Sequence, residues 1–559
     1  MALLAAAAVA EGYLQVSRSS DRAGGRVVYS ERTEPRTLNP LLASDSISRD
    51  IIHQLTADLV HINRATLRTE PSLAEGWTIS PDGLRYIVNL RRGICFSDGR
   101  PFDADDVTFT FQVYLDERIG SPQRNLWILD GKPVEVRKLD AYRVEFDLPR
   151  VDAVGERIFD SVPILPRHLL EGPYRRGKLL EQWGLHTPPG EIAGLGPFRF
   201  KQYVPGQRVV LERNPYYWKR DEAGNRLPYL AELDFSLDGN EDMQVLRFEA
   251  GESDLISRIS ARNYPALETQ APRRGYVLQD AGPGFEWSFL CFNLARPGVW
   301  QRAAFRRAVS AAVDRDAIVH LIYHGYASPL GAPVAAGNLP WLDRKLSPPP
   351  RSLDRARELL AQDGFRWNGA GELRDPDGKD VNFSIIASST YPERTQMATL
   401  IQADLKPLGI RVEVIPLESR SLLDRLTRTR DFEACLAAIS SADADPTADL
   451  NVWLSSGVTH LWNPSQKAPG TPWEAEINRL MRQQMVTRDY GARKRLFDRV
   501  QEIAIENMPV IPLATPHLLM GAKAGLANVR PVSLDPYAIW NVEEIYWQKR
   551  AGLPPGQAQ

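Results

Sequence analysis

The sequence predicts an α/β protein that is divided into two or three domains. Its 559 residues exceed the roughly 250 to 300 at which one hydrophobic core stops growing. Between residues 381 and 436, short apolar strands alternate with helical segments, and this order favours parallel strand pairing. In residues 75–111, two tight turns and a helix start follow one another within one short unit.

That unit is predicted to fold as strand, turn, strand, turn and helix. The turn Ser80–Gly83 separates the apolar run 77–79 from the alternating run 86–90. Its Pro and Gly stand where a tight turn needs a fixed and a permissive φ, so we expect a hairpin. A second turn at 97–99 leads to Asp103, whose carboxylate can accept from the free N–H groups that open a helix.

The remaining elements follow from the spacing of apolar residues, which alternates in strands and recurs every three to four positions in helices. In the first half of the chain we expect a strand at 27–30, a helix with Ile51, Ile52, Leu55 and Leu59 on one face, paired strands at 134–136 and 142–146, and a hairpin from 194–200 back through 209–211. In the second half we expect a strand at 287–293, followed by strands at 381–386, 411–414 and 432–436 with helices at 397–408 and 422–426 between them. A long helix with Leu496, Val500 and Ile503 on one face and an apolar segment at 508–513 complete the order.

Composition excludes some classes of function. Lys and Arg number 68 against 70 Asp and Glu, so the net charge of −2 provides no broad basic field for nucleic acid. We therefore expect no nucleic-acid partner. Cys95, Cys291 and Cys435 are few and far apart, which is neither a disulfide framework nor a metal cluster.

The N-terminus carries the prediction of compartment. Leu3–Ala10 looks like the end of a secretory apolar region, with Ala8 and Ala10 in the small-residue cleavage positions. The basic region that normally precedes such a segment is missing. We therefore expect residues 1–25 to be either an incomplete secretory signal or a disordered or short Ala-rich helical segment without targeting value. No later run approaches the roughly 18 to 20 apolar residues needed to span a bilayer.

No catalytic or metal motif stands out in the sequence. It contains no nucleophile elbow, Walker loop, H-E-x-x-H or paired C-x-x-C motif. His320 and His324 are four residues apart and could share a helix face, but no further ligand stands nearby and a structural helix is favoured. We expect neither an enzyme nor a cofactor or bound metal.

Three strings carry a resemblance to a known family. Residues 77–83 match W-x-x-S-x-D-G, residues 96–107 match F-x-D-G-x-P-x-x-A-x-D-V, and 213–218 match R-N-P-x-Y-W. The chain resembles the extracytoplasmic solute-binding proteins of oligopeptide, dipeptide and nickel transporters, known as family 5. The resemblance covers about residues 26 to 547.

The resemblance implies a type II-like periplasmic binding protein with two lobes and an extra domain. The implied division assigns 26–65, 190–286 and 510–548 to a first lobe, 66–189 to an extra domain, and 287–509 to a second lobe. Hinge strands are expected near 287–293 and 508–514. The implied protein is a periplasmic monomer that encloses a peptide and delivers it to an inner-membrane ABC permease with ATPase subunits.

Two polar segments are the candidate ligand contacts. Glu34 lies in the loop after the first strand, where oligopeptide binders of this family carry an acid near the amino terminus of the peptide. Asp443 takes the place of the aspartate that pairs with the ligand ammonium, if one residue is deleted from the motif of the family. Asp445 follows it, although both acids can instead cap the helix near Pro446. Trp462 is expected to line a side-chain pocket or to pack in the second lobe.

Alternatives remain open at this point. The aromatic residues that surround the aspartate in the family are Ser440 and Ala444 here. A nickel chelate, an opine or an oligosaccharide is therefore an alternative ligand on the same scaffold. A hydrolase or a signalling subunit that reports its ligand to a receptor would be a different class of protein.

Overall fold

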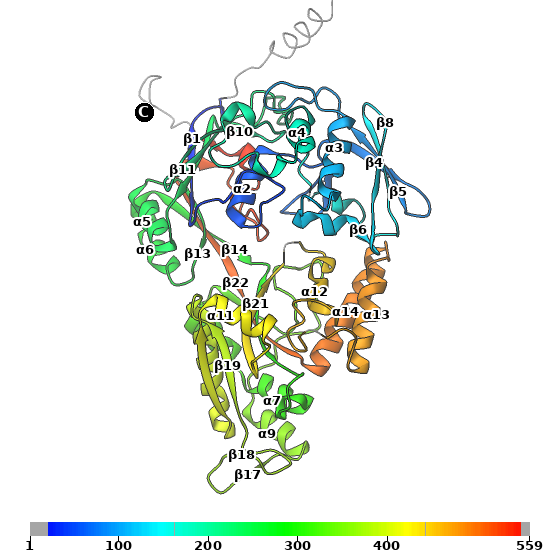
Figure 1. Cartoon of the computed structure of the whole chain (residues 1–559). Coiled ribbons are helices and arrows are strands. Elements are labelled where there is room, and N and C mark those ends of the chain that lie inside the picture. The colour runs from blue at the N-terminus through cyan, green and yellow to red at the C-terminus, as the bar shows by residue number, and fades with distance from the viewer. Residues whose placement is uncertain (1–20, 161, 442, 465, 549–559) are drawn as a thin grey trace, which may run out of the picture.

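The computed structural model describes residues 21–548 except 161, 442 and 465. Most of the predicted signal-like segment 1–25 lies outside these residues. The chain forms a broad part, which carries β1, β10 and α3, and a narrower part, which carries β19, α7 and α9 (Figure 1). Helices and strands are mixed throughout, as predicted. Among the described residues, none of the helices has the length and apolar character needed to cross a membrane.

One long sheet connects the two parts. Its main path runs β10-β11-β12-β1-β13-β22-β15-β21-β19-β20, and β14 and β16 also pair with β22. The strand β22 (Val510–Lys523) belongs to both parts, because its first half pairs with β15 (Glu286–Phe292) and its second half with β13 and β14. The two strands predicted as hinges are therefore β15 and the start of β22, and they lie side by side.

The division into two lobes and an extra domain stays a prediction, and we keep its names below. The first lobe holds β1 (Arg26–Glu31), α2 (Ser46–Leu55), β2 (Val60–Ile62), β10 (Phe198–Val204), β11 (Arg208–Arg213), β12 (Glu232–Leu237), α5 (Glu241–Ala250), β13 (Leu255–Ile259), α6 (Tyr264–Arg274), β14 (Tyr276–Pro283), β23 (Leu526–Ala527) and β24 (Tyr546–Trp547). The predicted boundary after residue 65 falls inside the hairpin that β2 forms with β3 (Thr69–Pro71).

The extra domain contains the predicted strand–turn–strand–turn–helix unit. It consists of a four-stranded antiparallel sheet in the order β4-β5-β9-β8 and of helix α3. Asp103 caps α3, and the carboxylate of Asp106 accepts from the Asp103 amide at 3.1 Å to complete a capping box, which confirms the predicted helix start. Its elements are β4 (Ala74–Ile79), β5 (Arg85–Leu90), α3 (Ala104–Leu115), β6 (Ile128–Leu129), β7 (Lys132–Pro133), β8 (Glu135–Asp140), β9 (Arg143–Asp147) and α4 (Arg167–Arg175), with the 3₁₀ turns η1 (Pro122–Trp127) and η2 (Gly155–Asp160).

The second lobe is built on the predicted parallel strands. β19 pairs in parallel with both β20 and β21, which confirms the prediction from alternating strands and helices. Its elements are α7 (Ala303–Ala312), α8 (Arg315–Ala317), β16 (Ala327–Pro329), α9 (Leu353–Gln362), β17 (Arg366–Trp367), β18 (Leu373–Arg374), β19 (Asn382–Ser388), α10 (Pro392–Leu405), β20 (Arg411–Leu417), α11 (Ser419–Leu423), β21 (Ala434–Ser440), the 3₁₀ turn η9 (Pro446–Asp449), α12 (Leu450–Trp453), α13 (Pro472–Gln484) and α14 (Tyr490–Asn507).

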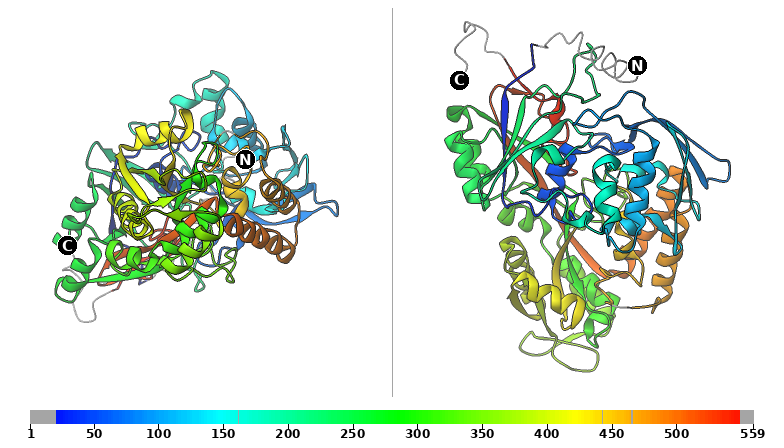
Figure 2. Two further views of the ribbon diagram at one scale, coloured as in Figure 1. Left: turned by 90° about the horizontal axis from the view of Figure 1, so that it is seen from below. Right: turned by 45° about the horizontal axis from the view of Figure 1, so that its top comes forward.

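The second lobe contacts the extra domain through its last two helices. Figures 1 and 2 show α13 and α14 beside the extra domain. The amide of Ala153 donates to the carbonyl of Met485 at 2.8 Å, so a backbone hydrogen bond joins the two units. This contact brings the loop 150–157 over the chain that follows β21.

Candidate functional site

A cavity of about 680 Å³, which we call the interlobe cavity, lies between the second lobe and the other two units. Its walls come from α2 and β2 of the first lobe, from η1, β6 and η2 of the extra domain, and from the segment 443–450 of the second lobe. This volume falls within the range of about 300 to 1,000 Å³ that is typical of ligand sites. The chain segments that meet here are far apart in sequence, so only the fold creates this space.

Asp443 and Arg157 face each other across this cavity. The Nε atom of Arg157 donates to Oδ2 of Asp443 at 3.2 Å, and its Nη2 donates to Oδ1. Arg157 also donates to the carbonyl of Leu67 at 2.8 Å. Burial alone would lower the pKa of Arg157, but the negative charge of Asp443 raises it. The predicted ammonium-binding carboxylate therefore sits in the cavity and is paired with a cation from the opposite wall.

Asp445 is held differently, by a buried pair within the second lobe. Arg493 of α14 donates to its two carboxylate oxygens at 2.9 and 2.8 Å, and both side chains are almost fully buried. Asp445 also caps η9 by accepting from the Thr447 amide at 3.0 Å. Burial would raise the pKa of Asp445, but the hydrogen bond and charge of Arg493 lower it. The hydrogen bond from Thr447 agrees with the predicted role of Asp445 as a helix cap. Its role as a ligand contact stays a prediction.

The walls contributed by the first lobe and the extra domain carry charges that sequence reasoning missed. Asp160 accepts from the amide of Ile62 at 2.8 Å and from Arg64 at 3.3 Å. Asp58 lies nearby, and its pKa is raised well above the usual range by burial and by the charge of Asp160. Burial lowers the pKa of His53 to about 4. No motif in the sequence marks these residues, because they become neighbours only when β2 packs on η2.

A second cavity of about 250 Å³ lies beside the strands that cross between the lobes. Glu286 at the start of β15 and Arg394 of α10 line it and approach within 3.6 Å. Ser440 also lines it, whereas Asp443 lines the larger cavity. The end of β21 therefore borders the smaller cavity, and the segment that follows it borders the larger one.

The other two predicted contacts lie outside these linings. Glu34 is exposed and accepts from the Tyr203 hydroxyl and from the Gly206 amide at 2.8 Å. Trp462 is 1% exposed, and its indole N–H donates to Glu474 at 3.3 Å. The packing alternative for Trp462 accounts for this burial, and the ligand-contact roles of both residues stay predictions.

The histidine pair considered for metal lies on the surface of the second lobe. His320 and His324 are both exposed. His320 lies in the π-helical turn Ile318–Ile322, whereas His324 lies beyond its end with a φ of 51°, so the two residues do not share a helix face. Within the part of the chain that the structure describes, no group of three or more His, Cys, Asp or Glu side chains is arranged to hold a metal ion.

Two lobes that share continuous strands and enclose a cavity define a class of protein that binds a small ligand between its lobes. Residues 68–460 match the model of the bacterial extracellular solute-binding proteins, family 5. The chain belongs to this family, as the resemblance predicted. Members of the family are extracytoplasmic substrate-binding proteins.

Curated relatives cover most of the chain. A probable ABC transporter-binding protein of Deinococcus radiodurans is 26% identical over 506 residues, which are 86% of this chain and 85% of the relative. The oligopeptide-binding protein AppA of Bacillus subtilis is 25% identical over 521 residues, which are 92% of this chain and 90% of the relative.

Solved structures share the fold. AppA of Bacillus subtilis in complex with a nonapeptide has a TM-score of 0.72 and 24% identity, and covers 95% of this chain and 100% of its own. NikA of Brucella suis in complex with Fe(III)-EDTA has a TM-score of 0.79 and 23% identity, and covers 94% of this chain and 100% of its own. These likenesses confirm the predicted type II periplasmic binding protein fold.

Proposed function

We propose that this protein is the periplasmic solute-binding component of an ABC importer, which encloses a peptide between its lobes and passes it to an inner-membrane permease with ATPase subunits. The observation that carries the proposal is the Asp443 carboxylate, which lies in the interlobe cavity and faces a cation from the opposite wall. The name of the AppA relative as an oligopeptide-binding protein supports the same ligand class. In this role the protein acts as a monomer and performs no chemistry.

The cavity suits a ligand that carries both signs of charge. Four arginines (Arg49, Arg64, Arg150 and Arg157) and five aspartates (Asp58, Asp152, Asp160, Asp443 and Asp445) contribute to its lining. An unmodified peptide has an ammonium at one end and a carboxylate at the other. It can replace the ion pair of Asp443 and Arg157 with two new pairs, so that neither side chain is left buried without a partner.

Closure of the lobes would strengthen these pairs. Excluding water lowers the local dielectric, and each charge pair then interacts more strongly than in an open cleft. Asp443 lines the larger cavity and Ser440, at the end of β21, lines the smaller one, so we propose that an extended ligand that starts at Asp443 continues toward Ser440 and Arg394. Main-chain hydrogen bonds would hold such a peptide with little dependence on its side chains.

Calorimetry with one peptide in free and N-acetylated form tests the proposal. In Asp443→Asn, we expect binding of the free peptide to weaken by about 1 to 3 kcal/mol because a charge-assisted bond is lost. Acetylation should weaken wild-type binding by a similar amount and should add little in the variant, because both changes remove the same interaction. Asp354→Asn is the matched control, since its side chain is 92% exposed on α9.

The ligand itself is found by native mass spectrometry of protein purified from its host. Equal affinity for free and acetylated peptides would contradict the assignment of Asp443 as the residue that binds the peptide ammonium. A co-purified nickel chelate, opine or oligosaccharide, with no peptide bound, would replace the peptide by one of the alternative ligands.

A further inference from the structure

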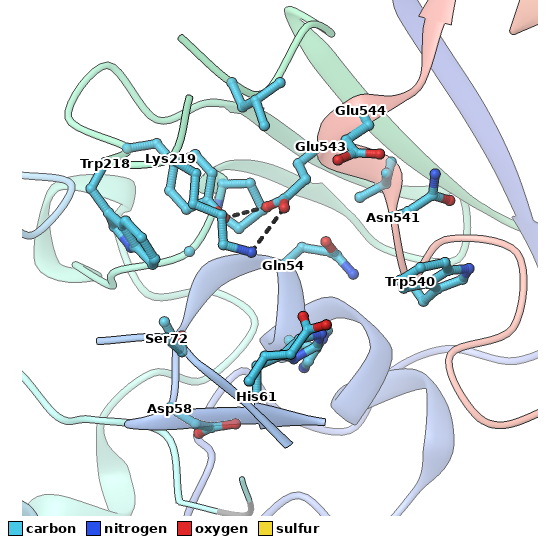
Figure 3. A pocket seen from close by; sticks show the side chains of 18 of the residues that line it. Gln54, Asp58, His61, Ser72, Trp218, Lys219, Trp540, Asn541, Glu543 and Glu544 are labelled. Carbon is cyan, nitrogen blue, oxygen red and sulfur yellow. Dashed lines mark hydrogen bonds and ion pairs between the residues drawn. The ribbon is translucent and has the colours of Figure 1, made fainter. Parts of the chain in front are cut away.

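A separate polar cavity of about 300 Å³ lies away from the second lobe, and we call it the lobe cavity (Figure 3). All residues that line it come from segments 53–72, 196–227 and 530–544. Figure 3 shows Gln54, His61 and Lys219 pointing toward one space from different elements. Its volume is near the lower end of the range for small-molecule sites.

Several buried polar atoms at this cavity have no hydrogen-bond partner within the described residues. They are two donors, Nε2 of Gln54 and Nε1 of Trp218, and two acceptors, Oδ1 of Asp58 and Oδ1 of Asn541. Gln54 is 2% exposed and Asn541 is 4% exposed. Leaving such a group unpaired costs about 1 to 3 kcal/mol, so a water or a ligand that pairs with these atoms would be stabilised.

The orientation of Asn541 is fixed by the protein. Its Nδ2 donates to the carbonyl of Asn528 at 2.8 Å, so the amide cannot be turned over without losing that bond. Oδ1 therefore presents an acceptor. The cavity thus offers an acceptor here and a donor at Gln54.

The charged groups at the lobe cavity largely cancel. Lys219 pairs with Glu543 at 2.9 Å, and Arg530 approaches Glu544 within 3.5 Å. Burial lowers the pKa of His61 to about 2, and the neighbouring His53 is likewise neutral near pH 7. An anionic ligand would meet these carboxylates, and a cationic one would meet Lys219 and Arg530. The balance favours a neutral ligand.

One aromatic ring offers an apolar surface at the same place. Trp540 lines the cavity and is only half-buried, while its indole N–H is already bonded to the carbonyl of Arg530. Its ring face is therefore the part that can contact a ligand. Aromatic faces pack well against C–H groups, whereas the polar atoms around them pair with hydroxyls.

We propose that the lobe cavity is a second ligand site, for a neutral polyhydroxylated molecule of the size of a monosaccharide or cyclic polyol. A hydroxyl can both donate and accept, so one such ligand can pair with the donor of Gln54 and the acceptor of Asn541 while its C–H face lies on Trp540. The site does not depend on the proposed peptide function. His53, Thr56 and Asp58 line both this cavity and the interlobe cavity, so the two sites share a wall.

The test uses ligand-observed saturation-transfer NMR on the full chain, with D-glucose, D-galactose and myo-inositol as probes. We expect at least one probe to bind wild-type protein, and Gln54→Leu and Trp540→Ala each to weaken that binding about tenfold or more. Gln202→Leu is the matched control, because Gln202 is exposed on β10. Asp443→Asn should leave probe binding unchanged.

Circular dichroism and thermal melting establish whether each variant is folded. If Gln54→Leu does not fold, Trp540→Ala alone provides the test. The proposal is overturned if none of the probes binds, because the cavity then holds water only. It is also overturned if both variants bind the probe like wild type, or if Asp443→Asn abolishes probe binding, since the probe then occupies the interlobe cavity. Failure of the wild-type protein to bind any peptide, together with probe binding, would contradict only the proposed function.

Discussion

The guanidinium of Arg157 and the carboxylate of Asp443 meet across the interlobe cavity from positions 286 residues apart in the chain. Arg157 stands on η2 of the extra domain, and Asp443 follows β21 of the second lobe. Their side chains are 14% and 24% exposed, so water screens the pair only in part. The pair therefore links two units that a ligand must separate or bridge.

Replacing Arg157 with Gln should loosen this link. We expect the free energy of unfolding to fall by about 1 to 3 kcal/mol, because Asp443 loses its charged partner in a partly buried position. We also expect a larger radius of gyration without ligand, measured by small-angle scattering. Arg428→Gln is the matched control, since its side chain is 74% exposed and pairs within one helical turn with Asp424. Scattering curves that coincide for Arg157→Gln and wild type would contradict the role of this pair in holding the units together.

Replacing Asp445 should affect the stability of the protein more than its affinity for peptide, which is the reverse of the effect expected for Asp443. Asp445→Asn leaves the buried Arg493 without a full countercharge, so we expect a loss of about 3 to 5 kcal/mol in the free energy of unfolding. Urea denaturation measures this loss. Asp443→Asn, in contrast, should change peptide affinity more than stability. A mild effect of Asp445→Asn on stability, together with a large loss of affinity, would assign ligand contact to Asp445 and overturn its structural role.

Local chemistry explains which parts of the fold were predictable. The turns and the capped helix of residues 75–111 depend on neighbours within a few positions, so Pro81, Gly83 and Asp103 were enough to predict them. The parallel strands of the second lobe followed from the alternation of strands and helices. In both cases the structure confirms the pattern.

Contacts between distant segments were not predictable in this way. Nothing near Arg157 marks it as the partner of Asp443, because the pairing depends on how η2 and the segment after β21 are placed. Cys291 and Cys435 are far apart in the sequence, yet they stand directly opposite each other in β15 and β21. The lobe cavity could likewise not be predicted from the sequence, since its lining comes from three separate segments.

Two glycines of the segment Gly194–Pro197 pack directly on the end of α2. A Cβ atom at Gly194 would lie 1.9 Å from the carbonyl oxygen of Leu55, and one at Gly196 would lie 2.4 Å from that of Gln54. Backbone atoms cannot move aside easily, so we expect Gly194→Ala to lower the free energy of unfolding by about 1 to 3 kcal/mol or more.

Gly190→Ala is the control for this change, because a Cβ there meets nothing within 4 Å. Thermal melting compares the two variants. Equal melting temperatures for Gly194→Ala and Gly190→Ala would show that the end of α2 can retreat from the hairpin, and would contradict the tight packing.

The last prediction concerns pH and Asp449, which is the last residue of η9. Burial raises the pKa of Asp449 from 3.8 to about 6, and the charge of Asp443 adds to this, while a hydrogen bond from Ser441 opposes it. Because the folded protein holds this proton more tightly than the unfolded chain does, the stabilisation is fully present below pH 3.8 and is lost as the pH rises through about 6. At about 1.4 kcal/mol per pKa unit, the loss is about 2 to 3 kcal/mol.

Asp449→Asn stays neutral at every pH, so its stability relative to wild type should increase over this window in urea unfolding curves. Asp354→Asn should keep the wild-type slope, and an unchanged slope in Asp449→Asn would show that Asp449 is ionised in the folded protein.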